Sequence, residues 1–438
     1  MLLPNNGRIV IVDDLINEAQ PLITIFSKKR IPFNYYQGTR ITDFPENPNE
    51  NCLRILFLDL NIFETNQDPK TVISALHPII KRIVPDNPSP YVLIIWSKKT
   101  KDYADELEEH FNNKLQSKKP AKTIFLNKNK YFDLFEGGIW KEKEDSLDSI
   151  SVDLKLELEN ISVLKALIGW ENIVHEKTNE TIGEFSSFYP INPDWDKNTK
   201  SIIFHLAKSV AGDDDIETLD NKQKLAKALG NINSFLSDKV ETEINSKNLE
   251  EILDIKDPEY DKQRKKDGLT IKIKSRINEK LHVSNRLFNV TDFEQGHIYP
   301  IKDYDQHLDR IIWSKIFSPE NPSKLDEIRI NSSLIQLDIT PVCDYSQDKN
   351  YVRFLYGIIT KHEHSKYFKS QFYFCSPILN IFGEEKILVF DFRFIKTFTK
   401  KEIIEKGIIP SFKLRKEICT DIQSQLANQI NRPGISNL

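Results

Sequence analysis

Short apolar runs alternate with amphipathic stretches through the first 135 residues of the chain. Four runs have the length and the Ile, Leu, Val and aromatic content of buried parallel strands: residues 8–12, 53–58, 91–96 and 123–126. Residues 15–29, 70–84 and 102–118 have helical spacing, and residues 33–36 form a weaker fifth strand. We therefore predict a doubly wound, five-stranded parallel α/β domain over residues 7–140, with little helical pattern at 38–51.

The pattern changes twice further along the chain. Apolar residues recur at helical spacing over 152–188, 201–210 and 216–244, which predicts a helical connector or bundle within residues 147–255. Strand-like runs follow at 334–339, 351–359, 371–374 and 387–394, and an amphipathic helix is predicted over 412–430. Residues 265–438 are therefore expected to form an α+β, small barrel-like effector or interaction domain.

Acidic, hydroxyl and amine side chains follow the four strong strands of the first domain. Asp13 and Asp14 come after the first run, Asp59 after the second, Ser97 after the third and Lys128 after the last. The carboxyl ends of parallel strands meet at one edge of a sheet, so these side chains should converge there. Three carboxylates in one crevice repel one another unless a divalent cation is bound, and Mg²⁺ prefers oxygen ligands. With the metal present, Asp59 can act as a nucleophile toward a phosphoryl donor, while Lys128 and Ser97 bind phosphoryl oxygens.

This arrangement resembles the receiver domain of two-component response regulators. That family has an acidic pair after strand 1, a phosphoacceptor Asp after strand 3, Ser or Thr after strand 4 and Lys after strand 5. The resemblance also implies that the backbone carbonyl of Asn61 is a metal ligand, beside the carboxylates of Asp13, Asp14 and Asp59. It implies an aromatic switch residue at Phe125, acting with Ser97. The expected chemistry is Mg²⁺-dependent phosphorylation of Asp59, and the expected phosphodonor is a histidine kinase or a kinase-like ATPase.

Two departures from the family pattern support an alternative. Phe63 and Asn129 stand where prolines are usual, and the intervals between Asp59, Ser97 and Lys128 are longer than usual. The domain could then be a degenerate receiver that serves as a non-phosphorylated docking module in a larger complex. The first hypothesis, that of a phosphorylated receiver, describes a signalling protein whose receiver switches a C-terminal effector through protein interaction.

A third reading places an enzymatic site in the C-terminal region. Cys343 and Asp344 lie at a strand end, and Asp391 and Arg393 lie at the end of another apolar strand. Cys343 with Asp344 or Asp391 would then serve an effector enzyme, whereas a structural cysteine and an internal ion pair are the simpler interpretations. The region also faintly resembles modules of bacterial conflict and antiviral defence systems, which would place the protein in such a pathway.

Composition narrows the choice of partners and compartment. The 438 residues carry 61 Lys and Arg against 65 Asp and Glu, a net charge of −4, which gives no general argument for nucleic-acid binding. Four separated cysteines form no C-x-x-C pair and favour reduced thiols: Cys52, Cys343, Cys375 and Cys419. No run approaches the ~18 apolar residues of a membrane span, and the first residues lack a signal-peptide pattern. We therefore expect a cytoplasmic protein with no membrane partner.

Overall fold

The computed structural model of the protein describes most of the chain, in two compact units that comprise residues 1–255 and 256–438. The described residues are 8–46, 53–60, 68–98, 103–135, 139–143, 146–159, 162–211, 216–246, 269–284, 288–291, 293–301, 313, 325–346 and 349–430. Among these residues, no helix combines the length and the apolar character needed to cross a membrane.

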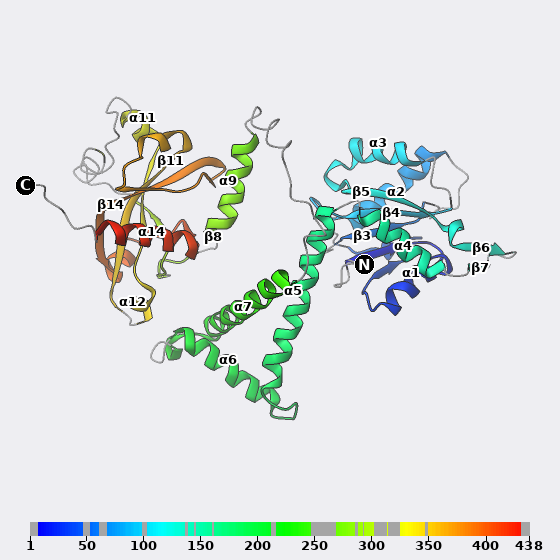
Figure 1. The fold of residues 1–438 in the computed structure, drawn as a ribbon, viewed down its shortest axis with the longest axis horizontal. Helices are drawn as coiled ribbons and strands as arrows, with labels where there is room; N and C mark the ends of the chain where they lie inside the picture. The colour runs from blue at the N-terminus through cyan, green and yellow to red at the C-terminus, as the bar shows by residue number, and fades with distance from the viewer. Residues whose placement is uncertain are drawn as a thin grey trace, which may run out of the picture. The chain divides into compact units, whose positions relative to one another are not determined.

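The first unit contains the predicted five-stranded parallel sheet (Figure 1). Its strands are β1 (Ile9–Val12), β2 (Asn34–Tyr36), β3 (Ile55–Leu58), β4 (Val92–Ser97) and β5 (Lys122–Asn127). They pair in the order β2-β1-β3-β4-β5, and every pair is parallel. This order is a doubly wound arrangement in which the chain changes direction across the sheet between β1 and β3. The predicted fold class is confirmed.

Helices cover both faces of this sheet, which explains why its central strands are apolar throughout. The helices are α1 (Ile16–Lys28), α2 (Pro69–Ile83), α3 (Ala104–Lys114) and α4 (Ser146–Glu159). Val10 and Val12 of β1 face the core shared with α2 and α3, while Ile9 and Ile11 face the core shared with α1 and α4. The two cores therefore follow the two-residue alternation of a strand.

Local signals account for several connections. Pro69 starts α2, and the Asp68 carboxylate caps the helix by accepting from the Thr71 amide at 2.9 Å. Between β2 and β3, the described residues contain a single 3-10 turn, Ile41–Asp43, as the weak helical pattern there predicted. A hairpin of β6 (Phe132–Phe135) and β7 (Ile139–Glu142), which we did not predict, follows β5.

The middle of the chain is helical, as predicted. It consists of α5 (Ser162–Ser187), α6 (Trp195–Ala211) and α7 (Asn221–Ser246). A small core of Ala207, Ala211, Ile216 and Ala228 joins α6 to α7, and ion pairs such as Lys177–Glu243 join α5 to α7. The first half of α5 packs on the sheet domain, where Glu171 pairs with both Arg8 and Arg54.

The second unit is built on an eight-stranded antiparallel sheet. Its strands are β8 (Val283–Ser284), β9 (His297–Pro300), β10 (Ser333–Asp338), β11 (Tyr351–Lys361), β12 (Tyr373–Cys375), β13 (Leu379–Ile381), β14 (Glu384–Thr399) and β15 (Phe412–Leu414). The order is β12-β14-β11-β10-β9-β15-β8, with β13 beside β14. Its helices are α9 (Leu269–His282), α11 (Leu325–Ile330), α12 (Val342–Ser346), α13 (Lys400–Glu405) and α14 (Lys416–Ile430).

Two features of this sheet bear on the sequence analysis. At Gly357 the register between β11 and β14 shifts, and a Cβ there would lie 2.5 Å from the ring of Phe390, so a side chain would not fit. The predicted terminal helix over 412–430 was wrong at its start. Phe412–Leu414 forms β15 between β9 and β8, and the helix begins only at Lys416.

Candidate functional site

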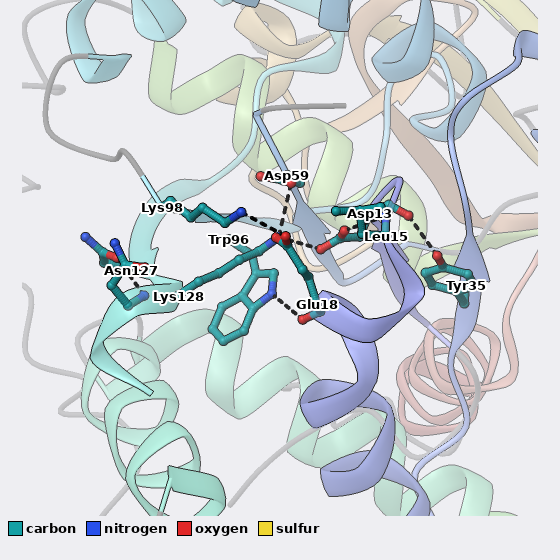
Figure 2. A network of polar contacts seen from close by, with 10 residues as sticks. Asp13, Leu15, Glu18, Tyr35, Asp59, Trp96, Lys98, Asn127 and Lys128 are labelled. Atoms are coloured by element: carbon teal, nitrogen blue, oxygen red, sulfur yellow. Dashed lines mark hydrogen bonds and ion pairs between the residues drawn. The ribbon is translucent and has the colours of Figure 1, made fainter. Parts of the chain in front are cut away.

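Three of the four predicted strand ends bring their polar residues into contact, and Ser97 ends the fourth strand without a side-chain hydrogen bond to them. Asp13 follows β1, Asp59 follows β3, Ser97 is the last residue of β4, and Lys128 follows β5. The amide of Asp59 donates to the Val12 carbonyl at 3.0 Å, which extends the pairing of β1 and β3 up to the site. Figure 2 shows Asp13, Asp59 and Lys128 converging, with the side chain of Glu18 reaching the same point from α1.

Three carboxylates form the acidic side of this cluster. Asp13 and Asp59 are buried and Asp14 is half-buried, and each offers an oxygen within 4.8 Å of the others. Burial raises the pKa of Asp13 to about 7, with the negative charge of Asp59 adding to the effect. Burial and the charge of Asp59 also raise the pKa of Asp14. These three carboxylates could hold a metal ion, because a cation would offset both the burial of their charges and their mutual repulsion.

Lys128 forms the cationic centre and is 1% exposed. Its Nζ donates to Asp13 Oδ2 at 2.6 Å, to Glu18 Oε2 at 2.8 Å and to Asp59 Oδ2 at 3.0 Å. Burial disfavours the charged ammonium, but its three carboxylate partners outweigh that cost and raise its pKa above the ordinary value. An ammonium has three N–H donors, so these contacts use all of them.

Glu18 is the member of the cluster that the sequence analysis missed. It is the third residue of α1, four positions after Asp14, and the first turn of the helix places it beside the end of β1. Its second oxygen, Oε1, pairs with Lys98 Nζ at 2.9 Å. Burial raises the pKa of Glu18, but the two lysines more than offset this and hold its pKa below the usual value. The one local signal for it was an acidic residue in the first turn of the helix that follows Asp13 and Asp14.

Two buried oxygens at the site lack a hydrogen-bond partner among the described residues. They are Asp59 Oδ1 and Ser97 Oγ. Asp59 is 3% exposed and Ser97 is 0% exposed, so solvent offers little compensation. Unsatisfied buried polar atoms are rare in folded proteins because each one costs free energy. Asp59 also binds Lys128 through its other oxygen, so its unpartnered Oδ1 lies in the ion-pair cluster, where a further ligand could satisfy it.

Of the remaining predicted site residues, Phe125 lies within the part of the chain that the structure describes and Asn61 lies outside it. Phe125 is partly buried against the core shared with α2 and α3, on the face to which Ser97 belongs by strand alternation. The switch pairing of these two residues stays a prediction. Asn61, the expected carbonyl ligand, lies outside the described residues, as do Phe63 and Cys52.

A second set of contacts connects the cluster to α4. Trp96 Nε1 donates to the Glu18 carbonyl at 3.3 Å, and its ring stacks on Tyr131 with centroids 5.7 Å apart. Asp153 of α4 accepts from both Lys130 Nζ and the Tyr131 hydroxyl at 2.5 Å. The 3-10 turn Lys128–Lys130 and Tyr131 therefore link the buried lysine to a helix on the face of the sheet.

Of the C-terminal candidates, Asp344, Asp391 and Arg393 are engaged in ion pairs. Cys343 is exposed, with its Sγ 3.8 Å from Asp344 Oδ1. Asp344 also accepts from Lys349 at 2.7 Å, and Asp391 is held by Arg393 through contacts of 2.9 and 2.6 Å. The Arg393 guanidinium lies over the rings of Phe372 and Tyr373. A nucleophilic role for Cys343 stays a prediction.

Comparisons with known proteins identify no family for this chain. No protein-family model matches the chain, and a search of curated proteins finds no match.

Proposed function

We propose that the N-terminal domain is a receiver-like module that accepts a phosphoryl group on Asp59 with the help of Mg²⁺. One observation carries the proposal: the buried and unpartnered Asp59 Oδ1 lies in a cluster with two further carboxylates and beside Lys128. A doubly wound parallel sheet of the same strand order supports the resemblance stated from the sequence. Ligands of such sheets bind at the carboxyl ends of the strands, which is where this cluster lies.

The donor set fits a hard divalent cation. Asp13, Asp14 and Asp59 would hold it through oxygen atoms, and the carbonyl of Asn61 is the fourth expected ligand. The four carboxylates of the cluster, Glu18 included, outnumber its two ammonium groups, so added positive charge is favoured. When bound, Mg²⁺ would supply charge neutralisation for an incoming phosphoryl group.

Different residues of the chain would perform the separate parts of the phosphoryl transfer. An oxygen of Asp59 attacks the donor's phosphorus and forms the new P–O bond, while the bond between phosphorus and the leaving group breaks and the leaving group keeps the electron pair. The Lys128 ammonium donates to the phosphoryl oxygens, where negative charge gathers. The unpartnered Ser97 hydroxyl gains an acceptor in the modified state. The donor class is the phosphohistidine of a histidine kinase, or a kinase-like ATPase.

The rest of the chain would carry the response. The helical middle packs directly on the sheet domain through Glu171, and Asp153 of α4 binds the turn that follows Lys128. We assign the second unit the role of effector, acting through protein interaction. A bacterial defence pathway is the context that the sequence resemblance offers for such an effector.

The test is the intact mass of the purified protein after incubation with Mg²⁺ and acetyl phosphate. We expect wild type to gain one phosphoryl group and Asp59→Asn to gain none. Asp344→Asn is the matched control, since it removes a carboxylate that is held by ion pairs in the other unit, and it should be modified like wild type.

The competing function is a docking module without phosphotransfer. It draws support from Lys128, whose three donors are already satisfied by carboxylates and leave a closed ion-pair cluster. A folded wild-type protein that gains no mass under these conditions would overturn the phosphoacceptor proposal in favour of this function.

A further inference from the structure

Glu18 has a position that separates it from the three carboxylates of the candidate metal cluster. It belongs to that cluster's ion-pair network but not to the oxygens that lie within 4.8 Å of one another. Its two oxygens are divided between two cations, Oε2 with Lys128 and Oε1 with Lys98. Figure 2 shows both lysines reaching the carboxylate of this side chain. Trp96 donates to its backbone carbonyl, which anchors the turn of α1 that presents it.

The contacts of Lys128 make Glu18 a competitor of Asp59. The ammonium has three protons, and Asp13, Glu18 and Asp59 each receive one. A phosphoryl group on Asp59 needs a donor from the same ammonium, so one of the existing hydrogen bonds must be given up. The bond to Asp59 at 3.0 Å is the longest of the three, and Asp13 at 2.6 Å and Glu18 at 2.8 Å hold the same ammonium.

Glu18 competes with a phosphoryl group for Lys128, but its negative charge should favour the binding of a cation. Glu18 lies close to the metal cluster, because it shares the Lys128 ammonium with Asp13 and Asp59 through contacts of 2.6–3.0 Å. A buried negative charge at this range attracts a divalent cation and repels an anionic phosphoryl group. The same side chain therefore favours one ligand of the site and opposes the other.

We propose that Glu18 is a positioning residue that divides Lys128 between α1 and Asp59, strengthening divalent-cation binding while restraining the lysine's contact with a phosphoryl group. This inference rests on the proposed function, because it assigns Asp59 as the phosphoryl acceptor. It predicts effects of opposite sign on two ligands, which a residue that only maintains the fold would not produce.

The experiment measures two affinities in the full-length protein: Mg²⁺ alone, and beryllium fluoride at saturating Mg²⁺ as a phosphoryl-group mimic on a carboxylate oxygen. For Glu18→Gln, which keeps the shape and removes the charge, we expect Mg²⁺ to bind roughly three- to tenfold more weakly. Beryllium fluoride should bind more tightly by a similar factor, because the competing carboxylate and its repulsion are both gone. Glu18→Asp keeps the charge but shortens the reach, so its Mg²⁺ affinity should stay near wild type while its beryllium fluoride affinity rises.

Asp105→Asn is the matched control, because Asp105 is an exposed acid in the first turn of α3, and it should change neither affinity. Glu18→Gln with both affinities weakened would show a structural role, and unchanged affinities would show no role; either outcome overturns the proposal. If wild type binds Mg²⁺ but no beryllium fluoride, the phosphoacceptor function fails on its own, and the Mg²⁺ comparison still decides whether Glu18 strengthens cation binding. A wild type that binds neither probe overturns both.

Discussion

The Lys128 cluster and the Asp391–Arg393 pair both contain buried carboxylates, but the partners of these carboxylates differ. Asp391 is 0% exposed, and both of its oxygens accept from Arg393. In the Lys128 cluster, one ammonium serves three carboxylates and Asp59 Oδ1 accepts from no described donor. A bidentate pair that satisfies its own carboxylate has no need of a ligand. An excess of carboxylates with an unpartnered oxygen marks a group that a further cation or phosphoryl group would complete.

Removal of Lys128 should change the stability of its cluster more than any other substitution considered for the two ionic groups. Lys128→Met leaves three carboxylates without their common cation, and we expect the first unit to lose about 3–5 kcal/mol of unfolding free energy. Added Mg²⁺ should restore part of this loss, because the cation replaces the missing positive charge. Denaturant unfolding with and without Mg²⁺ measures both effects. A variant as stable as wild type would show that the three contacts contribute no net stability.

Asp338 sharpens the comparison, because this buried carboxylate has no lysine or arginine partner among the residues that the structure describes. It accepts from the Thr340 amide at 2.9 Å and from the Tyr345 hydroxyl, and burial raises its pKa to about 7. Its folded pKa exceeds the unfolded value, so its contribution to stability is greatest below pH ~4 and is lost as the pH rises to about 7. We expect this group to cost the second unit roughly 3 kcal/mol over that range.

The measurement for Asp338 is the free energy of unfolding of the second unit across that pH range. Asp338→Asn, which stays neutral, should flatten the dependence. A variant with the same slope as wild type would contradict the assignment to Asp338.

Arg393→Met tests the Asp391–Arg393 pair. It leaves the Asp391 carboxylate buried without its two guanidinium contacts, which should cost about 1–3 kcal/mol. The loss should be smaller than for Lys128→Met, because the Arg393 side chain is 42% exposed and water can reach the vacated space. Mg²⁺ should give no rescue, since one carboxylate alone is a poor site for it. Rescue as large as that of Lys128→Met would remove the distinction between the two clusters.

Cys343→Ser should have the smallest effect. The thiol is exposed, and its polar contact is a weak one to Asp344, so stability should change by less than about 0.5 kcal/mol. The phosphoryl gain on Asp59 should also be unchanged. A variant that folds normally but loses an effector activity would instead support a C-terminal enzymatic site.

The sequence predicted the sheet domain and the positions of most site residues because both follow from local rules. Buried parallel strands are apolar throughout, and residues after such strands share one edge, so Asp13, Asp59 and Lys128 could be placed together. Glu18 could not be placed in the same way, because its role depends on how α1 packs against β4 and β5. The strand Phe412–Leu414 was missed for a similar reason, since its partners β8 and β9 lie more than a hundred residues earlier.

The depth of the Lys128 ion pairs determines how the protein responds to salts. Ions in solution screen exposed charges over a Debye length of about 8–10 Å at physiological ionic strength, but they screen buried pairs much less. The side chains of these pairs are 0–3% exposed, so sodium chloride has little access to the fields between them. Ionic strength alone should leave the first unit almost unchanged, whereas a divalent cation that fits the carboxylates should act at low concentration. For this edge of the sheet, the identity of the ion matters more than the amount of salt.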